Sequence, residues 1–324
     1  MTVTTRADGM TTRQATTARA GILLAVASAA GFGLAGPLAK SLLESGWSPA
    51  AVVAVRVGGA FLVLAIPCLV VLLREGLPTA RQTRRLVVYG VVAVALAQLC
   101  YFNAVQYLSV GVALLLEYLA PVLLIGWHWW RTKTPPTAPV LIGAGVAMAG
   151  MVFVLDLLTG LKLHPIGVLW GLGAAICLCV YFILSDEGDP SVTTSPLLMT
   201  TVGTGVGAAV LLAAGTVGLV PLSAATEPVL LAGTELAWWV PILLIVGVSA
   251  VFAYLSGITA VRRLGSSPAS FVALSEVLFA VIFAAILLAQ RPSLGQALGG
   301  ALVLVGIAIV QRRSETQKQA VSAG

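Results

Sequence analysis

Three charged residues stand inside long apolar runs of this sequence: Arg56, Glu117 and Glu276. If these runs cross a membrane, a charge near the middle of one costs about 2.5–3.5 kcal/mol on insertion scales. Residues of this kind face the interior of a helix bundle, where they pair with one another or bind ions and substrates. We therefore take these three as the first candidates for a site that binds a charged solute or a proton.

Arg56 and Glu117 lie at the same depth in their runs. Each is the seventh residue from the same predicted membrane surface, which places it roughly 10 Å below that surface in a helix. The equal depth predicts that the two are close enough to pair. The pair would act as a gate, as a zwitterion site in which Arg56 binds a carboxylate and Glu117 an ammonium group, or as a permanent structural ion pair.

Glu276 lies about nine residues into its run, near the predicted midplane, and has no evident basic partner in the sequence. Burial disfavours the charged form of a carboxyl group. Glu276 is therefore a candidate site for a proton or an ammonium group. The alternative is a protonated side chain that only hydrogen bonds to a neighbouring helix.

Aromatic residues at helical spacing are candidates for the wall of a substrate cavity. One stripe consists of Trp170, Ala174, Cys177 and Tyr181. Tyr101 and Gln98 form a similar stripe, which Tyr254 matches in the second half. Aromatic side chains also anchor helices at membrane interfaces, and for Trp170 that alternative stays open.

Pro121 follows Glu117 by one turn and removes a backbone hydrogen bond there. A missing bond of this kind is tolerated in a membrane helix where protein or a cavity satisfies the free carbonyl. Pro121 therefore predicts a kink beside the Glu117 carboxylate. The kink would serve gating or simply packing.

Other kinds of chemistry find no support in the sequence. Four cysteines lie inside apolar runs rather than in paired loop positions, and neither a paired histidine motif, a Walker motif nor Gly-x-Ser-x-Gly occurs. We therefore predict no catalytic residues, no metal and no cofactor. The basic residues lie between apolar runs and not in an aromatic-rich module, so nucleic acid is not an expected partner.

Composition identifies the solvent around these candidates as lipid. Of the 324 residues, 59% are hydrophobic and 9% are charged, and the mean hydropathy is +1.03. Soluble domains carry roughly 25% charged residues. The sequence therefore predicts a polytopic, all-α membrane protein.

Ten apolar runs are each about long enough to cross a hydrocarbon core, which takes ~20 helical residues. They are residues 20–42, 50–73, 86–109, 111–130, 138–155, 165–185, 196–220, 237–261, 267–289 and 294–311. Residues 1–19 and 312–324 are predicted as tails, the second of them disordered. The first run could also be a signal peptide, but it continues well past Ala29, which favours a span.

The basic residues predict the orientation. With the N-terminus in the cytoplasm, fourteen Lys and Arg residues fall inside and three outside. This bias predicts that both termini lie in the cytoplasm of a cell-membrane protein.

The second half of the chain repeats the first at a spacing of 156 residues. The identical pairs are Ala104 and Ala260, Val105 and Val261, Leu108 and Leu264, Ala113 and Ala269, Pro136 and Pro292, Gly143 and Gly299, and Gly150 and Gly306. Two repeats of five spans, residues 20–156 and 165–311, would lie in opposite orientations, because five is odd. Inverted repeats are typical of secondary transporters, whose site lies between the halves.

The motifs on which a family resemblance rests occur in both halves. They are Ala54-Val55-Arg56, Ala104-Val105-Gln106-Tyr107, Glu117 through Pro121, Ala260-Val261-Arg262-Arg263-Leu264-Gly265, Ser275-Glu276-Val277, and Gln296 with Gly299 and Gly306. On these motifs the chain resembles EamA-type, ten-span members of the drug/metabolite transporter superfamily over nearly its whole length. Ala39-Lys40-Ser41 and Leu116-Glu117-Tyr118 with Pro121 are similar to segments of threonine/homoserine-type amino-acid exporters.

Two positions depart from the family pattern. Val277 stands where the family usually has proline after the glutamate, and Ala289-Gln290 stands where it often has Gly-Glu. The first change is expected to alter a helix kink, and the second removes an acidic group near the membrane edge.

The resemblance implies a secondary transporter that works by alternating access and exports amino acids or related compounds. An importer or exchanger of another solute, such as a sugar, a nucleotide derivative or a cationic drug, is the alternative, and a membrane-embedded enzyme fits less well. The expected partners are a small-molecule substrate and lipid. Protons and a second copy of the chain in a homodimer are candidates.

Overall fold

The computed structural model describes residues 4–107, 110–154, 164–186, 194–289 and 293–323, and these are mostly helical. The elements, in chain order, are α1 Thr4–Gly33, α2 Ala35–Glu44, α3 Pro49–Glu75, α4 Ala80–Val88, the π-helix η1 Tyr89–Leu96, α5 Ala97–Tyr107, α6 Val110–Glu117, α7 Ala120–Thr132, α8 Ala138–Val154, α9 Pro165–Ser185, α10 Pro196–Thr216, β1 Val229–Leu231, β2 Thr234–Leu236, α11 Trp239–Val246, the π-helix η3 Gly247–Phe252, α12 Ala253–Leu264, α13 Ser266–Ala273, α14 Ser275–Leu287 and α15 Leu294–Ala323. The described chain is thus mostly helical, and the all-α prediction holds except for the two short strands.

Seven helical segments of the described chain are long and apolar enough to cross a membrane. They are 19–44, 49–74, 80–101, 165–185, 196–216, 239–264 and 266–287. Two shorter apolar helices lie at Ala138–Phe153 and Ala297–Val310. The remaining predicted run, 111–130, is divided between α6 and α7. The chain is thus a multi-pass membrane protein.

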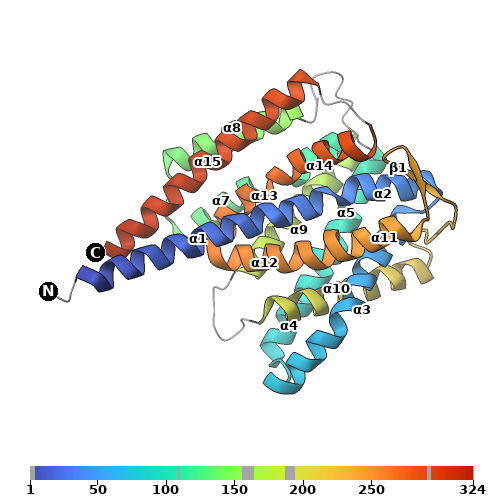
Figure 1. Cartoon of the computed structure of the whole chain (residues 1–324), viewed down its shortest axis with the longest axis horizontal. Coiled ribbons are helices and arrows are strands. Elements are labelled where there is room, and N and C mark those ends of the chain that lie inside the picture. Colours follow the sequence, from blue (N-terminus) through green and yellow to red (C-terminus); the bar gives the residue numbers. More distant parts are fainter. Residues whose placement is uncertain (1–3, 108–109, 155–163, 187–193, 290–292, 324) are drawn as a thin grey trace.

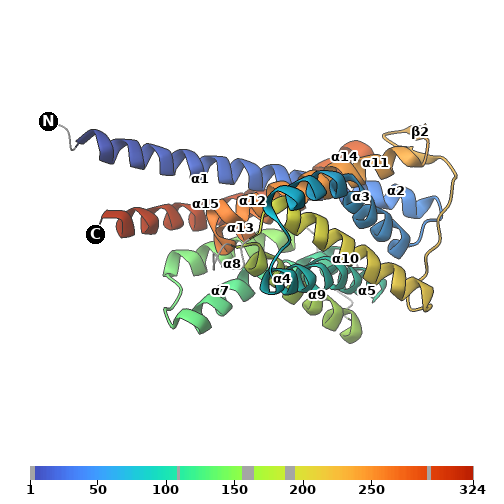
Figure 2. The same ribbon diagram turned by 90° about the horizontal axis from the view of Figure 1, so that it is seen from below.

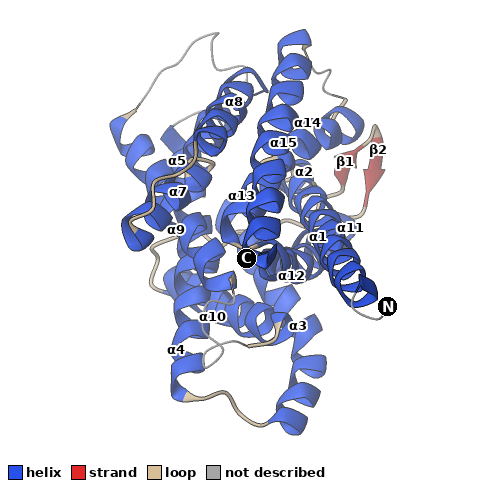
Figure 3. Ribbon diagram, turned by 90° about the vertical axis from the view of Figure 1, so that its left-hand side faces the viewer, coloured by secondary structure: helices blue, strands red, loops and turns tan. Residues whose placement is uncertain are grey.

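The predictions for the two tails and one loop need correction. α15 continues to Ala323, so the predicted disordered tail is helical, and α1 already begins at Thr4. After Gln311 the C-terminal stretch has neither Gly nor Pro before the last residue and is rich in Glu, Lys, Gln and Arg, which are good helix formers. The antiparallel hairpin β1–β2, drawn in red in Figure 3, was not predicted.

Three spans are interrupted in the middle. α1 gives way to α2 at Leu34, and α6 to α7 after Glu117. Pro37 and Pro121 lie four residues beyond Gly33 and Glu117, so neither carbonyl can receive the usual helical hydrogen bond.

The third interruption, at Leu274 between α13 and α14, forms without a proline. Instead, the Leu274 N–H donates to the carbonyl of Phe271 at 3.2 Å, and the Val277 N–H donates to Leu274 at 3.2 Å. These bonds tighten the chain into a single narrower turn. Valine at position 277 therefore does not prevent the break.

α8 and α15 lie side by side along one flank of the molecule (Figure 1). Glycines allow their backbones to approach. A Cβ added to Gly306 would lie 2.6 Å from the Gly143 carbonyl oxygen, and one added to Gly150 would lie 2.7 Å from that of Gly299. Small residues at such contacts are the usual basis of close helix packing in membranes.

The other main helix pairs are α1 with α12, α5 with α9, and α3 with α10. Each pair joins one helix from the first half of the chain to one from the second. The halves therefore form one bundle rather than two separate domains.

The hairpin lies at the opposite end of the molecule from the two chain termini (Figure 2). Here the Ser48 N–H donates to the Ser223 carbonyl at 2.9 Å, the Trp47 indole N–H to the Ala225 carbonyl at 2.7 Å, and the Ala232 N–H to the Leu287 carbonyl at 2.7 Å. We call this region the hairpin end. Its contacts connect the α2–α3 turn to the segment before β1, and the hairpin turn to the end of α14.

The other end is held by polar contacts between helix termini. Arg85 of α4 donates to the carbonyls of Leu184 and Asp186 at 2.7 and 2.6 Å. The Asp186 carboxylate accepts from the Ser266 N–H at 2.9 Å. The His128 ring lies 3.2 Å from the Ser266 hydroxyl, across the two halves. We call this region the basic end.

Candidate functional site

A cavity of about 820 Å³ lies between the two halves of the bundle. α1, α2, α3, α5, α6, α9, α12, α13 and α14 all contribute side chains to its wall, which is mostly apolar. Its polar residues are Ser28, Lys40, Arg56, Gln98, Tyr101, Glu117, Tyr118, Tyr181, Tyr254 and Glu276. Six of the eight residues predicted as site candidates are in the wall, and Pro121 and Trp170 are outside it.

The wall reaches solvent at the hairpin end. There it includes Lys40, whose side chain is 50% exposed, and Leu288 after the end of α14. Towards the basic end the wall stops at Val261 and Ala269, which are 1% and 3% exposed. The contacts of Ser266 lie beyond Ala269. This structure is therefore open towards the hairpin end and closed at the basic end.

Arg56 is a buried cation that forms no salt bridge with any described residue. Its side chain is 8% exposed, one of its terminal nitrogens donates to the Ser249 carbonyl at 2.8 Å, and its guanidinium lies 5.6 Å from the Phe32 ring centroid. Its Nε is buried and has no hydrogen-bond partner. An unsatisfied buried donor on a charged group is costly, and Arg56 is also among the residues that line the cavity.

The predicted ion pair between Arg56 and Glu117 is wrong. In the described part of the chain, the salt bridge is that of Lys40 with Glu44, at 3.8 Å. Arg56 instead turns towards the carbonyl of Ser249 in the π-helix η3. Although Arg56 and Glu117 were predicted at the same depth, they do not make contact, because the cavity lies between α3 and α6.

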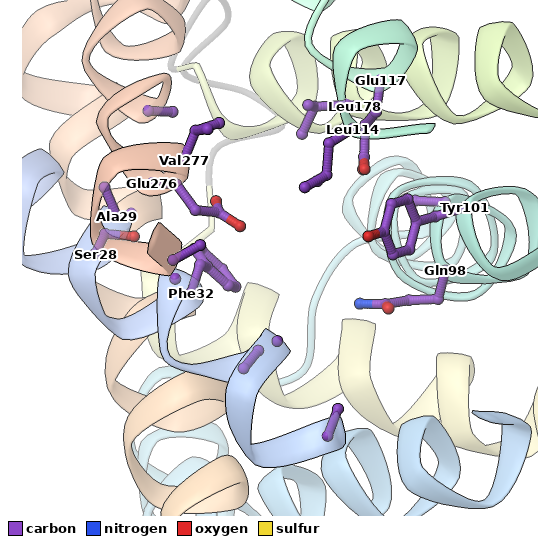
Figure 4. Close-up of a pocket in the computed structure, with 18 of the residues that line it drawn as sticks. Ser28, Ala29, Phe32, Gln98, Tyr101, Leu114, Glu117, Leu178, Glu276 and Val277 are labelled. Carbon is purple, nitrogen blue, oxygen red and sulfur yellow. The ribbon is translucent and has the colours of Figure 1, made fainter. Parts of the chain in front are cut away.

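The two carboxylates enter the cavity from opposite walls. Glu276, in the first turn of α14, lies beside Phe32, whereas Glu117, at the end of α6, lies on the far side near Leu114 and Tyr101 (Figure 4). Glu117 and Glu276 interact electrostatically with each other and with Arg56. Glu117 and Glu276 each lie where a helix is interrupted. Discontinuous membrane helices commonly form the sites that bind solutes and ions.

Aromatic rings line the space between these charges. The rings of Phe32 and Tyr254 meet edge to face at 5.1 Å, and those of Tyr181 and Tyr254 at 6.3 Å. Tyr101 and Gln98 project from the same helix into the cavity (Figure 4). Such rings offer both apolar surface and negative faces that attract cations.

Two predicted site residues lie elsewhere. Trp170 is 39% exposed on α9, in accord with the interfacial alternative. Pro121 is buried in the first turn of α7 and is not among the residues that line the cavity. Its place in the sequence accounts for the interruption between α6 and α7.

Phe32 and Tyr118 line the cavity but were not among the predicted site residues. Phe32 lies between Gly31 and Gly33, where added Cβ atoms would lie 3.0 Å from that of Ala253 and 2.8 Å from that of Phe279. The Gly-Phe-Gly spacing therefore signals a close helix crossing that directs one ring inward. Tyr118 follows Glu117 directly at the interruption of the span.

Within the described residues, no group of three or more His, Cys, Asp or Glu side chains could hold a metal ion. The four cysteines are buried and free. The polar groups that line the cavity are guanidinium, ammonium, carboxyl, amide and hydroxyl groups.

The sequence matches the description of the EamA-like transporter family twice, over residues 19–156 and again over residues 165–312. No curated protein matches it. Among 29 matching chains of solved structures, one titled "Crystal structure of protein" is 16% identical, with a TM-score of 0.69 over 92% of this chain and 98% of its own. That likeness concerns the fold alone. Because the family matches cover both halves, this protein belongs to the EamA-like transporter family, in the drug/metabolite transporter superfamily, whose members are membrane transporters of small solutes rather than enzymes.

Proposed function

We propose that this protein is a secondary transporter that exports amino acids or related compounds by alternating access. The observation that carries the proposal is the cavity between the halves, where a buried guanidinium without an ionic partner faces two carboxylates. An amino acid presents the complementary groups, a carboxylate and an ammonium. Binding between two packed halves suits a rocking mechanism.

Several features support an inverted repeat as the basis of that rocking. At the repeat spacing of 156 residues, η3 falls on residues 91–96 of η1, and Leu274 falls on Tyr118. At this spacing Gly143 corresponds to Gly299, and Gly150 corresponds to Gly306. The contact of Gly143 with Gly306 is therefore equivalent to the contact of Gly299 with Gly150. Equivalent glycines meeting in this crosswise manner are expected when two antiparallel helices are related by a two-fold axis in the membrane plane.

We further propose ten spans, with α6–α7, α8 and α15 added to the seven long apolar segments. The helix ends that meet at the basic end carry Arg81, Arg84, Arg85, Arg131, Lys133, Arg262 and Arg263. The positive-inside rule puts this end in the cytoplasm. The cell membrane would then be crossed with both termini inside, and the open cavity would face outward.

Counterflow in proteoliposomes tests the proposal. Purified protein would be loaded with one unlabelled amino acid at a time, and uptake of the same labelled compound would be followed. Saturable uptake that empty liposomes lack supports amino-acid transport. If well-folded protein transports no amino acid, the substrate class is overturned, and importers or exchangers of sugars, nucleotide derivatives or cationic drugs become the candidates.

Replacing Glu276 with glutamine is expected to abolish any response of transport to an imposed proton gradient. The amide keeps the shape of the side chain but can neither carry a negative charge nor release a proton. The measurement is labelled substrate flux at several external pH values, with exposed Glu235→Gln as the control. Wild-type flux from Glu276→Gln at every pH would exclude a coupling role for Glu276, leaving facilitated diffusion or coupling through Glu117.

A further inference from the structure

The charges of the cavity wall are unequal. Its charged members are Lys40, Arg56, Glu117 and Glu276. Lys40 lies at the exposed rim, where Glu44 neutralises it at 3.8 Å. The interior of the cavity therefore holds one guanidinium and two carboxylates.

The guanidinium of Arg56 defines one pole of the site. Its side chain is 92% buried, its Nε has no hydrogen-bond partner, and it lines the cavity. A guanidinium donates through a planar fork that matches a carboxylate in bidentate geometry. The α-carboxylate of an amino acid would bind this guanidinium where Arg56 lines the cavity.

Each glutamate has a different place relative to that pole. Glu276 lies beside Phe32, the ring on which the Arg56 guanidinium stacks at 5.6 Å (Figure 4). Glu276 is thus placed to accept the α-ammonium of a substrate whose carboxylate lies on Arg56. Glu117 lies across the cavity from Phe32, near Leu114 and Tyr101 (Figure 4), and is the second carboxylate available to a cationic group.

Resting on the proposed function, we infer that the substrate is a cationic amino acid, which has one carboxylate, an α-ammonium and a second cationic group at the end of its side chain. Glu117 would bind this distal cation. Leu114 and Leu178, which lie close to Glu117, offer apolar surface to a methylene chain, and Tyr101 offers a ring face to the cation (Figure 4). One guanidinium and two carboxylates then meet one carboxylate and two cations, and no buried charge is left unpaired.

Counterflow of lysine and of norleucine tests the inference. The two compounds share a four-carbon side chain, but norleucine lacks the terminal amino group. We expect wild-type protein to prefer lysine, and Glu117→Gln to lower the ratio of lysine to norleucine uptake by about tenfold or more, since a lost charged hydrogen bond costs that much. Glu235→Gln, which removes an exposed carboxylate of the hairpin, should leave the ratio unchanged.

Other results separate the inference from the function on which it rests. Transport of norleucine without transport of lysine overturns the cationic substrate but leaves an amino-acid transporter. An unchanged ratio in well-folded Glu117→Gln overturns the role of Glu117. Transport of neither compound, nor of any other amino acid, overturns the proposed function itself. If Glu117→Gln does not fold, thermal stabilisation of wild-type protein by lysine but not by norleucine supports the inference, and the reverse order contradicts it.

Discussion

Replacing Arg56 with alanine is expected to reduce counterflow by about 30-fold or more. Truncating one partner of a buried, hydrogen-bonded charge pair costs about 2–5 kcal/mol, and each 1.4 kcal/mol is a factor of about ten in affinity. Among the described residues of the cavity wall below the rim, Arg56 is the one basic group, so none of these side chains can replace it for a substrate carboxylate. The measurement is the concentration dependence of labelled substrate uptake.

The lysine variant at the same position separates binding from folding. Arg56→Lys keeps the charge but loses the planar fork that reaches both the Ser249 carbonyl and a ligand. A variant that elutes and melts like the wild type but transports poorly supports a binding role. If Arg56→Ala showed wild-type counterflow, Arg56 would not be part of the substrate site. If neither variant folded, the hydrogen bond of Arg56 to Ser249 in η3 would be mainly structural.

Replacing Gly306 with alanine is expected to destabilise the protein by about 1–3 kcal/mol, as overpacking does in other well-packed cores. The added Cβ would lie 2.6 Å from both the Ala147 backbone nitrogen and the Gly143 carbonyl oxygen. Backbone atoms cannot rotate away as a side chain can, so α8 and α15 would have to separate. The measurement is the melting temperature of the purified protein in detergent.

Gly145→Ala is the matched control for this contact. Gly145 lies on α8, two residues after Gly143, but nothing lies within 4 Å of its added Cβ. Alanine there should leave the melting temperature unchanged or raise it, since alanine is the better helix former. Equal melting temperatures of Gly306→Ala and Gly145→Ala would contradict the close α8–α15 contact.

The helical segments could be predicted from the sequence because hydropathy and length depend on the chain alone. The run 165–185 coincides with α9, and every predicted run after the first begins within about six residues of the start of a helix. The interruption before Pro121 was predicted as well, because a proline removes a hydrogen bond wherever it stands. The polarity of the stretch after Gln311 predicts disorder, but the stretch is helical because polar residues such as Glu, Lys and Gln form helices well.

Contacts between helices could not be predicted from depth along each span. Arg56 and Glu117 were correctly expected in the bundle interior, but pairing them required the rotation of α3 and α6 about their axes, which the sequence does not specify. The same uncertainty placed Trp170 on a stripe with Tyr181, although only Tyr181 reaches the cavity. The break at Leu274 could not be predicted from a proline, because it depends on local backbone hydrogen bonds.

Alternating access requires the cavity to open at each of its two ends in turn, so locking the basic end should stop transport. His128 and Ser266, from opposite halves, are 3.2 Å apart there. With the four native cysteines replaced, cysteines at both positions would be joined by a bis-methanethiosulfonate linker. We predict that the linked protein still binds substrate but loses counterflow, and that reductant restores it, while each single-cysteine variant is unaffected. Undiminished counterflow by fully linked protein would contradict alternating access through this cavity.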